Sequence, residues 1–182
     1  MLSRVEKFEA ALAQTDCDAV LVTNLKNIYY LTGFSGTEAT VFISKNRRIF
    51  LTDARYTLIA KGVVQGFDIV ETRDAIGEIV KIIADDKLQK IGFEDEISYA
   101  YFKMLESVFS AYELVPMTGF IENLRMIKDE QEIATIRKAC QISDQAFLDV
   151  LDFIKPGQTT EQAVMNFLDA RMRQLGASGA SF

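Results

Sequence analysis

Residues 24–36 read NLKNIYYLTGFSG, and they follow the apolar run AVLVT at residues 19–23. The run is short, rich in β-branched residues and bounded by polar ones, which favours a buried strand over a helix. Asn24 or Asn27 can then cap a short helix. Three side chains of that helix are expected to face the core: Ile28, Tyr29 and Leu31. A strand followed by a helix of little more than one turn therefore opens the fold.

A loop framed by glycines follows the helix: Gly33, Phe34, Ser35 and Gly36. Gly33 is expected to end the helix, and the loop is expected to display the ring of Phe34. The loop lacks the lysine of GxxxxGKS/T and the spacing of GxGxxG, which excludes a phosphate-binding loop. On its residues alone, it is a tight connection whose glycines supply positive φ angles.

The composition is that of one globular domain, or of one domain with a piece of another. Of the 182 residues, 49% are hydrophobic and 25% are charged, which is typical of folded chains rather than disordered ones. The net charge of −6 provides no basic patch for nucleic acid and no polybasic arm for a membrane. No apolar run approaches the ~20 residues that a membrane span needs. Nucleic acid and membranes are therefore not expected partners.

Cysteine and histidine usage narrows the chemistry further. Cys17 and Cys140 lack CxxC spacing, and the first residues lack a secretory signal, so a reduced, cytoplasmic protein is expected, with a lone disulfide as the alternative. Histidine is absent from the sequence. A Ser-His-Asp triad, a Cys-His pair and any site that needs an imidazole ligand are thereby excluded within these residues.

Strand-like and helix-like segments alternate over the first two thirds of the chain. Six strands are expected, at residues 19–23, 39–44, 48–52, 67–70, 91–94 and 112–115, with a hairpin turn at residues 44–47. Helices are expected after a capping box at Ser3 and Glu6, at residues 54–65, around residues 76–83 and after Ser98. Four aromatic residues near the last helix are assigned to the core: Tyr99, Tyr101, Phe102 and Phe109. The predicted fold class is α/β, with a six-stranded mixed sheet and helices on both faces.

From Thr118 onward the pattern predicts helices only, at residues 119–127, 129–154 and 160–175. Asp129 and Glu132 form a capping pair at the positive end of the long helix. An apolar stripe is expected along that helix: Ile133, Ile136, Cys140, Phe147, Val150 and Ile154. No strand follows to cover the stripe, so the chain is expected to stop just as a second domain begins.

Five motifs, in order, resemble the amino-terminal part of the Xaa-Pro peptidases, the group of prolidase, aminopeptidase P and creatinase. Residues 27–36 match the group's pattern Asn-Ile-x-Tyr-Leu-Thr-Gly-Phe-x-Gly. The other four are LTDARY at 51–56, LRMIKDEQE at 124–132, IKPG at 154–157 leading to Thr160 and Glu161, and GASGASF at 176–182. Each motif alone is weak, but together they span nearly the whole chain in the family's order.

The resemblance implies a creatinase-like, ribonuclease H-like domain at residues 1–123. Residues 124–182 would then be a linker and the opening helices of a pita-bread catalytic domain, which is incomplete. In the family, two Asp, one His and two Glu beyond the Ser-Phe motif hold two divalent metal ions, expected to be Mn or Co. None of these ligands has a counterpart here, so no catalytic or metal residue is carried over.

The full-length protein is thus expected to be a cytoplasmic metallopeptidase, an Xaa-Pro dipeptidase or aminopeptidase that cleaves the bond before proline. A homodimer is expected, with peptides that carry proline at the second position as substrates. The 182-residue chain alone is expected to contribute dimerisation and active-site capping, to bind no catalytic metal pair and to hydrolyse nothing. The alternative is a free-standing creatinase-type module for dimerisation or binding.

Two segments hold the candidate site residues. The resemblance makes the loop of Gly33, Phe34, Ser35, Gly36 and Thr37 a candidate lid over the active site of the partner subunit, with a purely structural role as the alternative. In the second segment, Asp53 is expected to be an N-cap and Arg55 to pair with a neighbouring acid, next to Tyr56. A substrate-contacting Arg55 is the other interpretation.

Residues 94–96 (EDE) form a short acidic run that could suggest a metal site. Consecutive residues at a strand end point in different directions, whereas a hard cation needs several oxygen ligands that converge on one point. The run is therefore expected to be a solvated loop.

Overall fold

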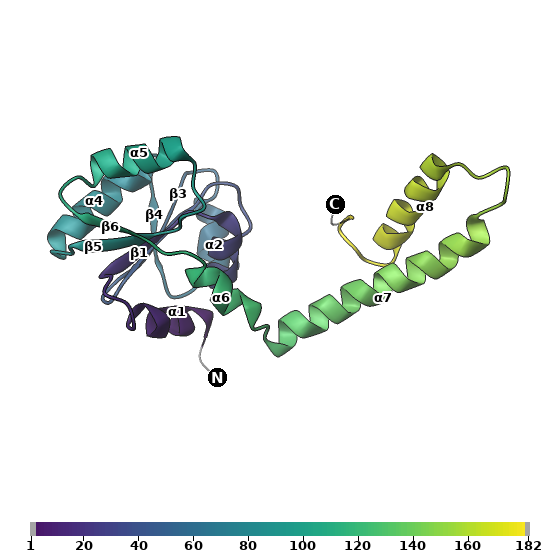
Figure 1. Ribbon diagram of the computed structural model, residues 1–182, viewed down its shortest axis with the longest axis horizontal. Coiled ribbons are helices and arrows are strands. Elements are labelled where there is room, and N and C mark those ends of the chain that lie inside the picture. The colour runs from purple at the N-terminus through teal and green to yellow at the C-terminus, as the bar shows by residue number, and fades with distance from the viewer. Residues whose placement is uncertain (1–2, 181–182) are drawn as a thin grey trace. The chain divides into compact units, whose positions relative to one another are not determined.

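The computed structural model describes residues 3–180 and forms two compact units, which part between Met126 and Ile127 (Figure 1). Each unit is described by itself below. Ser181 and Phe182, the end of the last predicted motif, lie outside the described residues. The domain boundary after residue 123 stays a prediction. None of the helices in residues 3–180 is long and apolar enough to cross a membrane.

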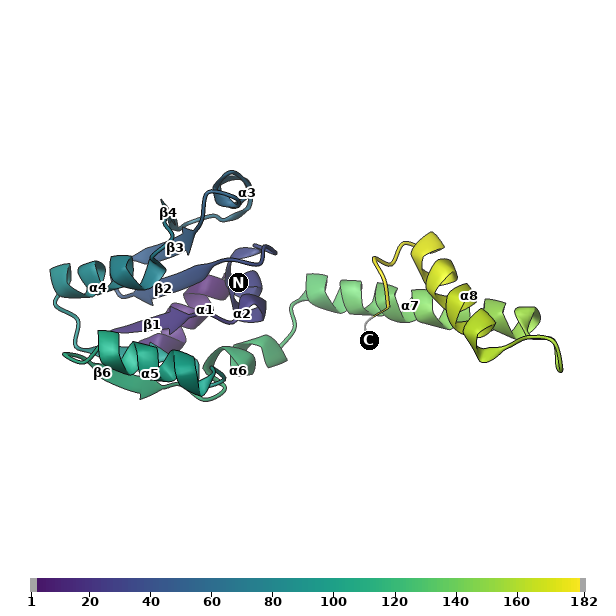
Figure 2. The same cartoon turned by 90° about the horizontal axis from the view of Figure 1, so that it is seen from above.

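The first unit is built on one six-stranded sheet. Its strands are β1 (Ala19–Val22), β2 (Thr40–Ser44), β3 (Arg48–Thr52), β4 (Asp68–Glu71), β5 (Lys90–Phe93) and β6 (Glu113–Pro116). They lie in the order β4-β3-β2-β1-β5-β6, and the labels β4, β3, β2, β1 and β6 follow this order from top to bottom in Figure 2. β2 pairs antiparallel with β1 and β3, and the remaining neighbours are parallel. The predicted mixed sheet and its hairpin are confirmed.

Helices cover both faces of the sheet. One layer consists of α1 (Arg4–Leu12), α2 (Leu25–Thr32), α3 (Thr57–Val63) and α6 (Phe120–Met126), and the other of α4 (Ala75–Asp85) and α5 (Tyr99–Val108). Figure 1 shows α4 and α5 above the sheet and α1 below it. The sheet has a hydrophobic core on each face, and alternate residues of β1 point into them. Val20 and Val22 lie in the first core, and Ala19 and Leu21 lie in the second. This is the predicted three-layer α/β arrangement.

Capping explains where several helices begin. Ser3 and Glu6 form the predicted capping box of α1, and Ser98 accepts a hydrogen bond from the amide of Tyr101 at α5. Asn24, rather than Asn27, caps α2 by accepting from the amide of Lys26.

Two predicted core aromatics are in fact exposed. Tyr29 is 54% exposed, whereas its neighbour Tyr30 is only 5% exposed. The buried face of α2 is rotated toward Asn27, which is fully buried, so Tyr29 points away from the sheet. Tyr99, in the first turn of α5, is 77% exposed, while Phe109 is buried and Tyr101 and Phe102 pack at the edge of the second core.

The second unit pairs two helices, α7 (Glu130–Phe153) and α8 (Glu161–Gln174). Asp129 and Glu132 form the predicted capping box, and Thr160 caps α8. The rings of Phe153 and Phe167 stack with centroids 4.5 Å apart.

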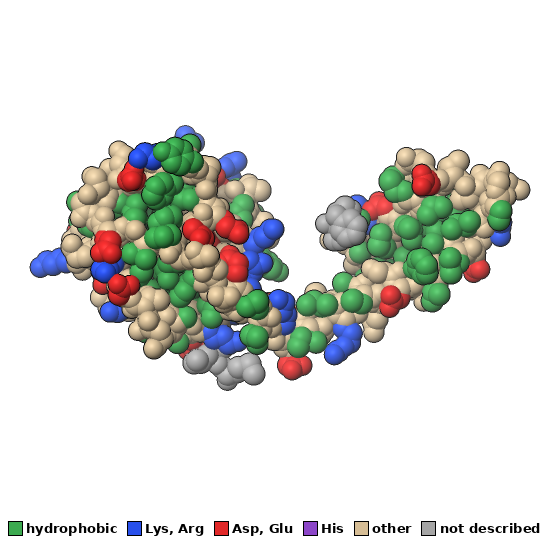
Figure 3. Space-filling model, viewed as in Figure 1, with side chains coloured by type: hydrophobic (Ala, Val, Ile, Leu, Met, Phe, Trp, Pro, Cys, Tyr) green, Lys and Arg blue, Asp and Glu red, His purple; other side chains and the backbone are tan. Residues whose placement is uncertain are grey.

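The predicted apolar stripe of α7 lies largely uncovered, as expected for a face that no strand follows to cover, and α8 packs on a neighbouring face of the helix. The buried residues are Ile142, Ala146 and Val150, whereas Ile136 and Phe147 are exposed. Figure 3 shows hydrophobic side chains gathered on the visible face of α7 and α8.

Candidate functional site

The candidate lid begins where α2 ends. Gly33 adopts φ +75°, the left-handed conformation that glycine tolerates best, and its amide donates to the carbonyl of Tyr29. The expectation of a displayed Phe34 is wrong, since this side chain is 1% exposed. Its ring packs edge-on against Phe50 at 5.0 Å and Tyr56 at 5.7 Å between centroids. The aromatic ring therefore anchors the loop to the sheet and leaves Ser35 and Thr37 exposed.

The structure brings the two predicted segments together. The hydroxyl oxygens of Thr37 and Tyr56 lie 2.7 Å apart and share a hydrogen bond. Gly36 fits closely between the rings, because a Cβ at this position would lie 2.3 Å from the ring of Phe34 and 2.9 Å from that of Tyr56. The lid and the residues after β3 thus form one continuous structure.

Asp53 and Arg55 form a local turn and not a helix cap. Asp53 Oδ1 accepts from the amide of Arg55 at 2.9 Å, and Oδ2 accepts from Arg55 Nη2 at 2.6 Å. The N-cap expectation is wrong: α3 begins later than predicted, at Thr57, and Tyr56 precedes it without a side-chain cap. The hydrogen bonds from the Arg55 guanidinium hold the pKa of Asp53 below its usual range. The acid that Arg55 pairs with is therefore Asp53 itself.

A buried carboxylate at the end of β5 was missed from the sequence. Glu94 is only 8% exposed, so the expectation of a solvated loop is wrong for this residue, although Asp95 and Glu96 are exposed. Its Oε2 accepts from the amides of Thr23 at 2.6 Å and Asn24 at 2.7 Å. Since β1 and β5 are parallel neighbours, Glu94 lies at the beginning of α2, where a negative charge is favourable.

The same carboxylate belongs to a network that reaches α6. Asn27 Nδ2 donates to Glu94 Oε1 and to Glu122 Oε1, both at 2.6 Å, and uses both of its hydrogens. Arg125 Nη1 donates to Asn27 Oδ1 at 2.8 Å. α2, β5 and α6 are therefore joined by charge-assisted hydrogen bonds. The only sequence signal was a polar Asn directly before the predicted core residue Ile28.

The described residues do not fit a catalytic metal pair. The sequence contains no histidine, and no group of three or more Cys, Asp or Glu side chains in residues 3–180 could hold a metal ion. The acidic run at residues 94–96 does not converge, because the Glu94 carboxylate is turned into the network with Asn27. Residues 3–180 therefore contain no cluster of metal ligands.

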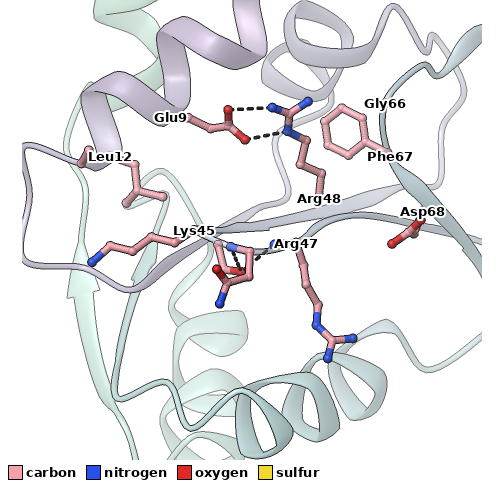
Figure 4. Close-up of a pocket in the computed structure, with 11 residues that line it drawn as sticks. Glu9, Leu12, Lys45, Arg47, Arg48, Gly66, Phe67 and Asp68 are labelled. Atoms are coloured by element: carbon pink, nitrogen blue, oxygen red, sulfur yellow. Dashed lines mark hydrogen bonds and ion pairs between the residues drawn. The ribbon is translucent and has the colours of Figure 1, made fainter.

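A cavity of about 690 Å³ lies apart from these residues, between α1, the β2–β3 turn and the start of β4. Figure 4 shows the ion pair along its wall, in which Arg48 Nε and Nη2 donate to the two carboxylate oxygens of Glu9 at 2.6 and 2.7 Å. Such a two-fold pair fixes α1 against the hairpin. The Arg48 guanidinium and the Glu9 carboxylate satisfy each other's hydrogen bonds, which favours a structural role for the pair.

Replacing Gly36 by alanine is expected to lower the free energy of unfolding of the first unit by about 1–3 kcal/mol, because the new methyl group would overlap the rings of Phe34 and Tyr56. Urea unfolding can be followed by tyrosine fluorescence, since all six tyrosines lie within residues 29–112. Gly62→Ala is the matched control: nothing lies within 4 Å of its added Cβ in α3, so a gain of ~0.5–1 kcal/mol is expected. Equal effects of the two changes would contradict the close packing of the lid.

Comparison with known proteins identifies two matching families. Residues 4–127 match the Creatinase/Prolidase N-terminal domain and residues 134–182 match Metallopeptidase family M24. An uncharacterized peptidase of Bacillus subtilis is 37% identical over 98% of this chain and 51% of its own length. The Xaa-Pro dipeptidase of Pyrococcus horikoshii is 24% identical over the whole chain and 51% of its own length. The chain thus spans about half the length of the curated relatives it matches.

Solved structures agree with this comparison. The crystal structure of an aminopeptidase P from Streptococcus thermophilus shares 57% identity, with a TM-score of 0.66 over 68% of this chain and 96% of that one. An Xaa-Pro dipeptidase from Bacillus anthracis shares 36% identity, with a TM-score of 0.90 over 98% of this chain and 50% of that one. The similarity to the dipeptidase extends through both units of the chain.

Proposed function

Because the chain belongs to the creatinase/prolidase amino-terminal domain family, we propose that it is the amino-terminal portion of a metal-dependent Xaa-Pro peptidase of the cytoplasm. The observation that carries this proposal is the succession of two family matches along one chain, the second of them to a metallopeptidase family. A module used only for binding has no need of helices that match a catalytic scaffold. The proposed reaction is hydrolysis of the peptide bond before a proline at the second position.

In this proposal the first unit supports dimerisation and caps the active site of the partner subunit. The lid of residues 33–37 suits that task, because buried Phe34 anchors it while exposed Ser35 and Thr37 face solvent. The hydrogen bond between the hydroxyls of Thr37 and Tyr56 adds a second anchor. A group that must meet a substrate in a fixed geometry is best held by such a packed support.

The two divalent metal ions of the proposed enzyme, Mn or Co, are assigned to residues beyond this chain. This assignment is supported by the histidine-free sequence and by the lack of a ligand cluster in residues 3–180. Sequencing the reading frame beyond Phe182 tests it. Two Asp, one His and two Glu in the expected order support the enzyme, and a stop codon directly after Phe182 leaves the free-standing module.

The capping role is tested in the protein encoded by the longer reading frame. Thr37→Ala and Tyr56→Phe each remove the 2.7 Å hydrogen bond of the lid. Each change is expected to lower kcat/KM for an Xaa-Pro dipeptide about tenfold, because the lid would no longer be held over the substrate.

The free energy of unfolding should change by less than about 1 kcal/mol, since one exposed hydrogen bond is lost. Ser107→Ala, which removes an exposed hydroxyl from α5, is the control and should leave kcat/KM unchanged. Wild-type kcat/KM in both lid variants would contradict the capping role.

A further inference from the structure

The sheet contains two places where neighbouring parallel strands lead to helices on opposite faces. β1 leads to α2 in the first helical layer, while its neighbour β5 leads to α5 in the second. β3 leads to α3 in the first layer, while its neighbour β4 leads to α4 in the second. Such switch points leave a crevice at the carboxyl ends of the strands, which is where open α/β sheets bind ligands.

The two crevices are occupied differently. At the β1–β5 switch point, the Glu94 carboxylate takes the place of an anionic ligand, since it accepts from the amides of Thr23 and Asn24. At the β3–β4 switch point, a cavity of about 430 Å³ is open to solvent. That volume lies within the range of small-molecule sites. The second crevice is therefore the one available to a ligand.

Two arginines provide positive charge to this second cavity. Arg55 uses Nε and Nη2 to bind Asp53, and within residues 3–180 its Nη1 makes no hydrogen bond. Arg73 is exposed and has no ion pair or hydrogen bond to another residue of the described chain. Ala75, the first residue of α4, also lines the cavity, and the amino-terminal end of that helix is already capped by the Asp74 carboxylate, which accepts from the amide of Gly77.

Acidic and hydroxyl groups complete the lining. Glu38 is exposed and Asp53 is held by Arg55, so the four charged side chains sum to zero. The hydroxyl of Thr52 donates to the carbonyl oxygen of Glu38 at 2.6 Å and holds that residue against the end of β3. A simple anion would meet two carboxylates here, whereas a ligand with both charges could satisfy Arg73 and Glu38 together.

We propose that the β3–β4 cavity binds a small zwitterion of the α-amino acid class. Its carboxylate would be bound by Arg73 and by Nη1 of Arg55, and its ammonium group by Glu38. A free α-amino acid carries both of these charged groups on one small molecule. The cavity is lined by Asp53 and Arg55 of the candidate site, and the proposal does not rest on the peptidase activity.

The test is an amide NMR titration of the 182-residue chain at constant ionic strength with L-alanine, L-proline, acetate and methylammonium. Saturable shifts are expected with the amino acids at the amides of Thr52, Arg55 and Arg73, with a dissociation constant in the millimolar range. Acetate and methylammonium should bind at least about fivefold more weakly, because each satisfies only one of the two charges.

Variants identify the two ends of the ligand. Arg73→Ala should weaken amino-acid binding about tenfold, and Arg137→Ala, the same change on an exposed arginine of α7, should leave it unchanged. Glu38→Gln should weaken binding of L-alanine but not of acetate. The absence of saturable shifts up to about 50 mM, equal binding of acetate and L-alanine, or wild-type affinity in Arg73→Ala would each overturn the proposal.

Discussion

Replacing Glu94 by alanine is expected to lower the free energy of unfolding of the first unit by about 3–5 kcal/mol. The carboxylate is 8% exposed and accepts hydrogen bonds from the amides of Thr23 and Asn24 and from the side chain of Asn27. Removing it leaves the part-buried amides of Thr23 and Asn24 without this acceptor, leaves Asn27 Nδ2 with Glu122 alone, and creates a cavity at the end of β5. A buried donor that loses its partner costs about 1–3 kcal/mol.

The measurement is urea unfolding of the 182-residue chain, followed by tyrosine fluorescence, which reports only on the first unit. Glu94→Gln should fall between alanine and wild type, because an amide retains one acceptor oxygen but cannot accept from all the donors. Glu96→Ala, two residues away and exposed, should change the free energy of unfolding by less than about 0.5 kcal/mol. A loss below about 1 kcal/mol in Glu94→Ala would contradict the role given to this network.

Most of the fold could be predicted because it depends on local patterns. The capping boxes at Ser3 and Asp129 are read from residues three positions apart, and the structure contains both. The six strands follow from short apolar runs between turn residues, and their alternation with helices gives the layers. Burial was predicted wrongly where helical periodicity was the only guide to which face of a helix is buried, as for Tyr29 on the short helix α2.

The polar groups of the site were less predictable because their partners are distant in sequence. Glu94 binds the amide of Asn24, which lies 70 residues away, and only the pairing of β1 with β5 brings them together. Thr37 and Tyr56 are 19 residues apart and were identified separately, without any sign that their hydroxyls meet. Phe34 was expected to be displayed because a loop next to glycines is usually exposed. Its burial depends on the space beside Phe50 on the sheet.

The second large effect is expected in catalysis. The protein encoded by the longer reading frame should release proline from an Xaa-Pro dipeptide when Mn²⁺ or Co²⁺ is supplied, and the 182-residue chain should release none above buffer. The reason is the supply of ligands: metal-dependent hydrolases bind their ions through His nitrogen and carboxylate oxygen. This chain has no histidine, and residues 3–180 hold no suitable cluster of acids.

Proline release by these two proteins, assayed side by side at equal concentration with the same metal, is the most direct test of the division between a capping unit and a catalytic unit. The expected result is turnover by the longer protein and none by the 182-residue chain. Calorimetry on the shorter chain should also show no tight binding of two metal ions. Turnover by the rigorously purified 182-residue chain would contradict both the peptidase assignment and the location of its active site beyond these residues.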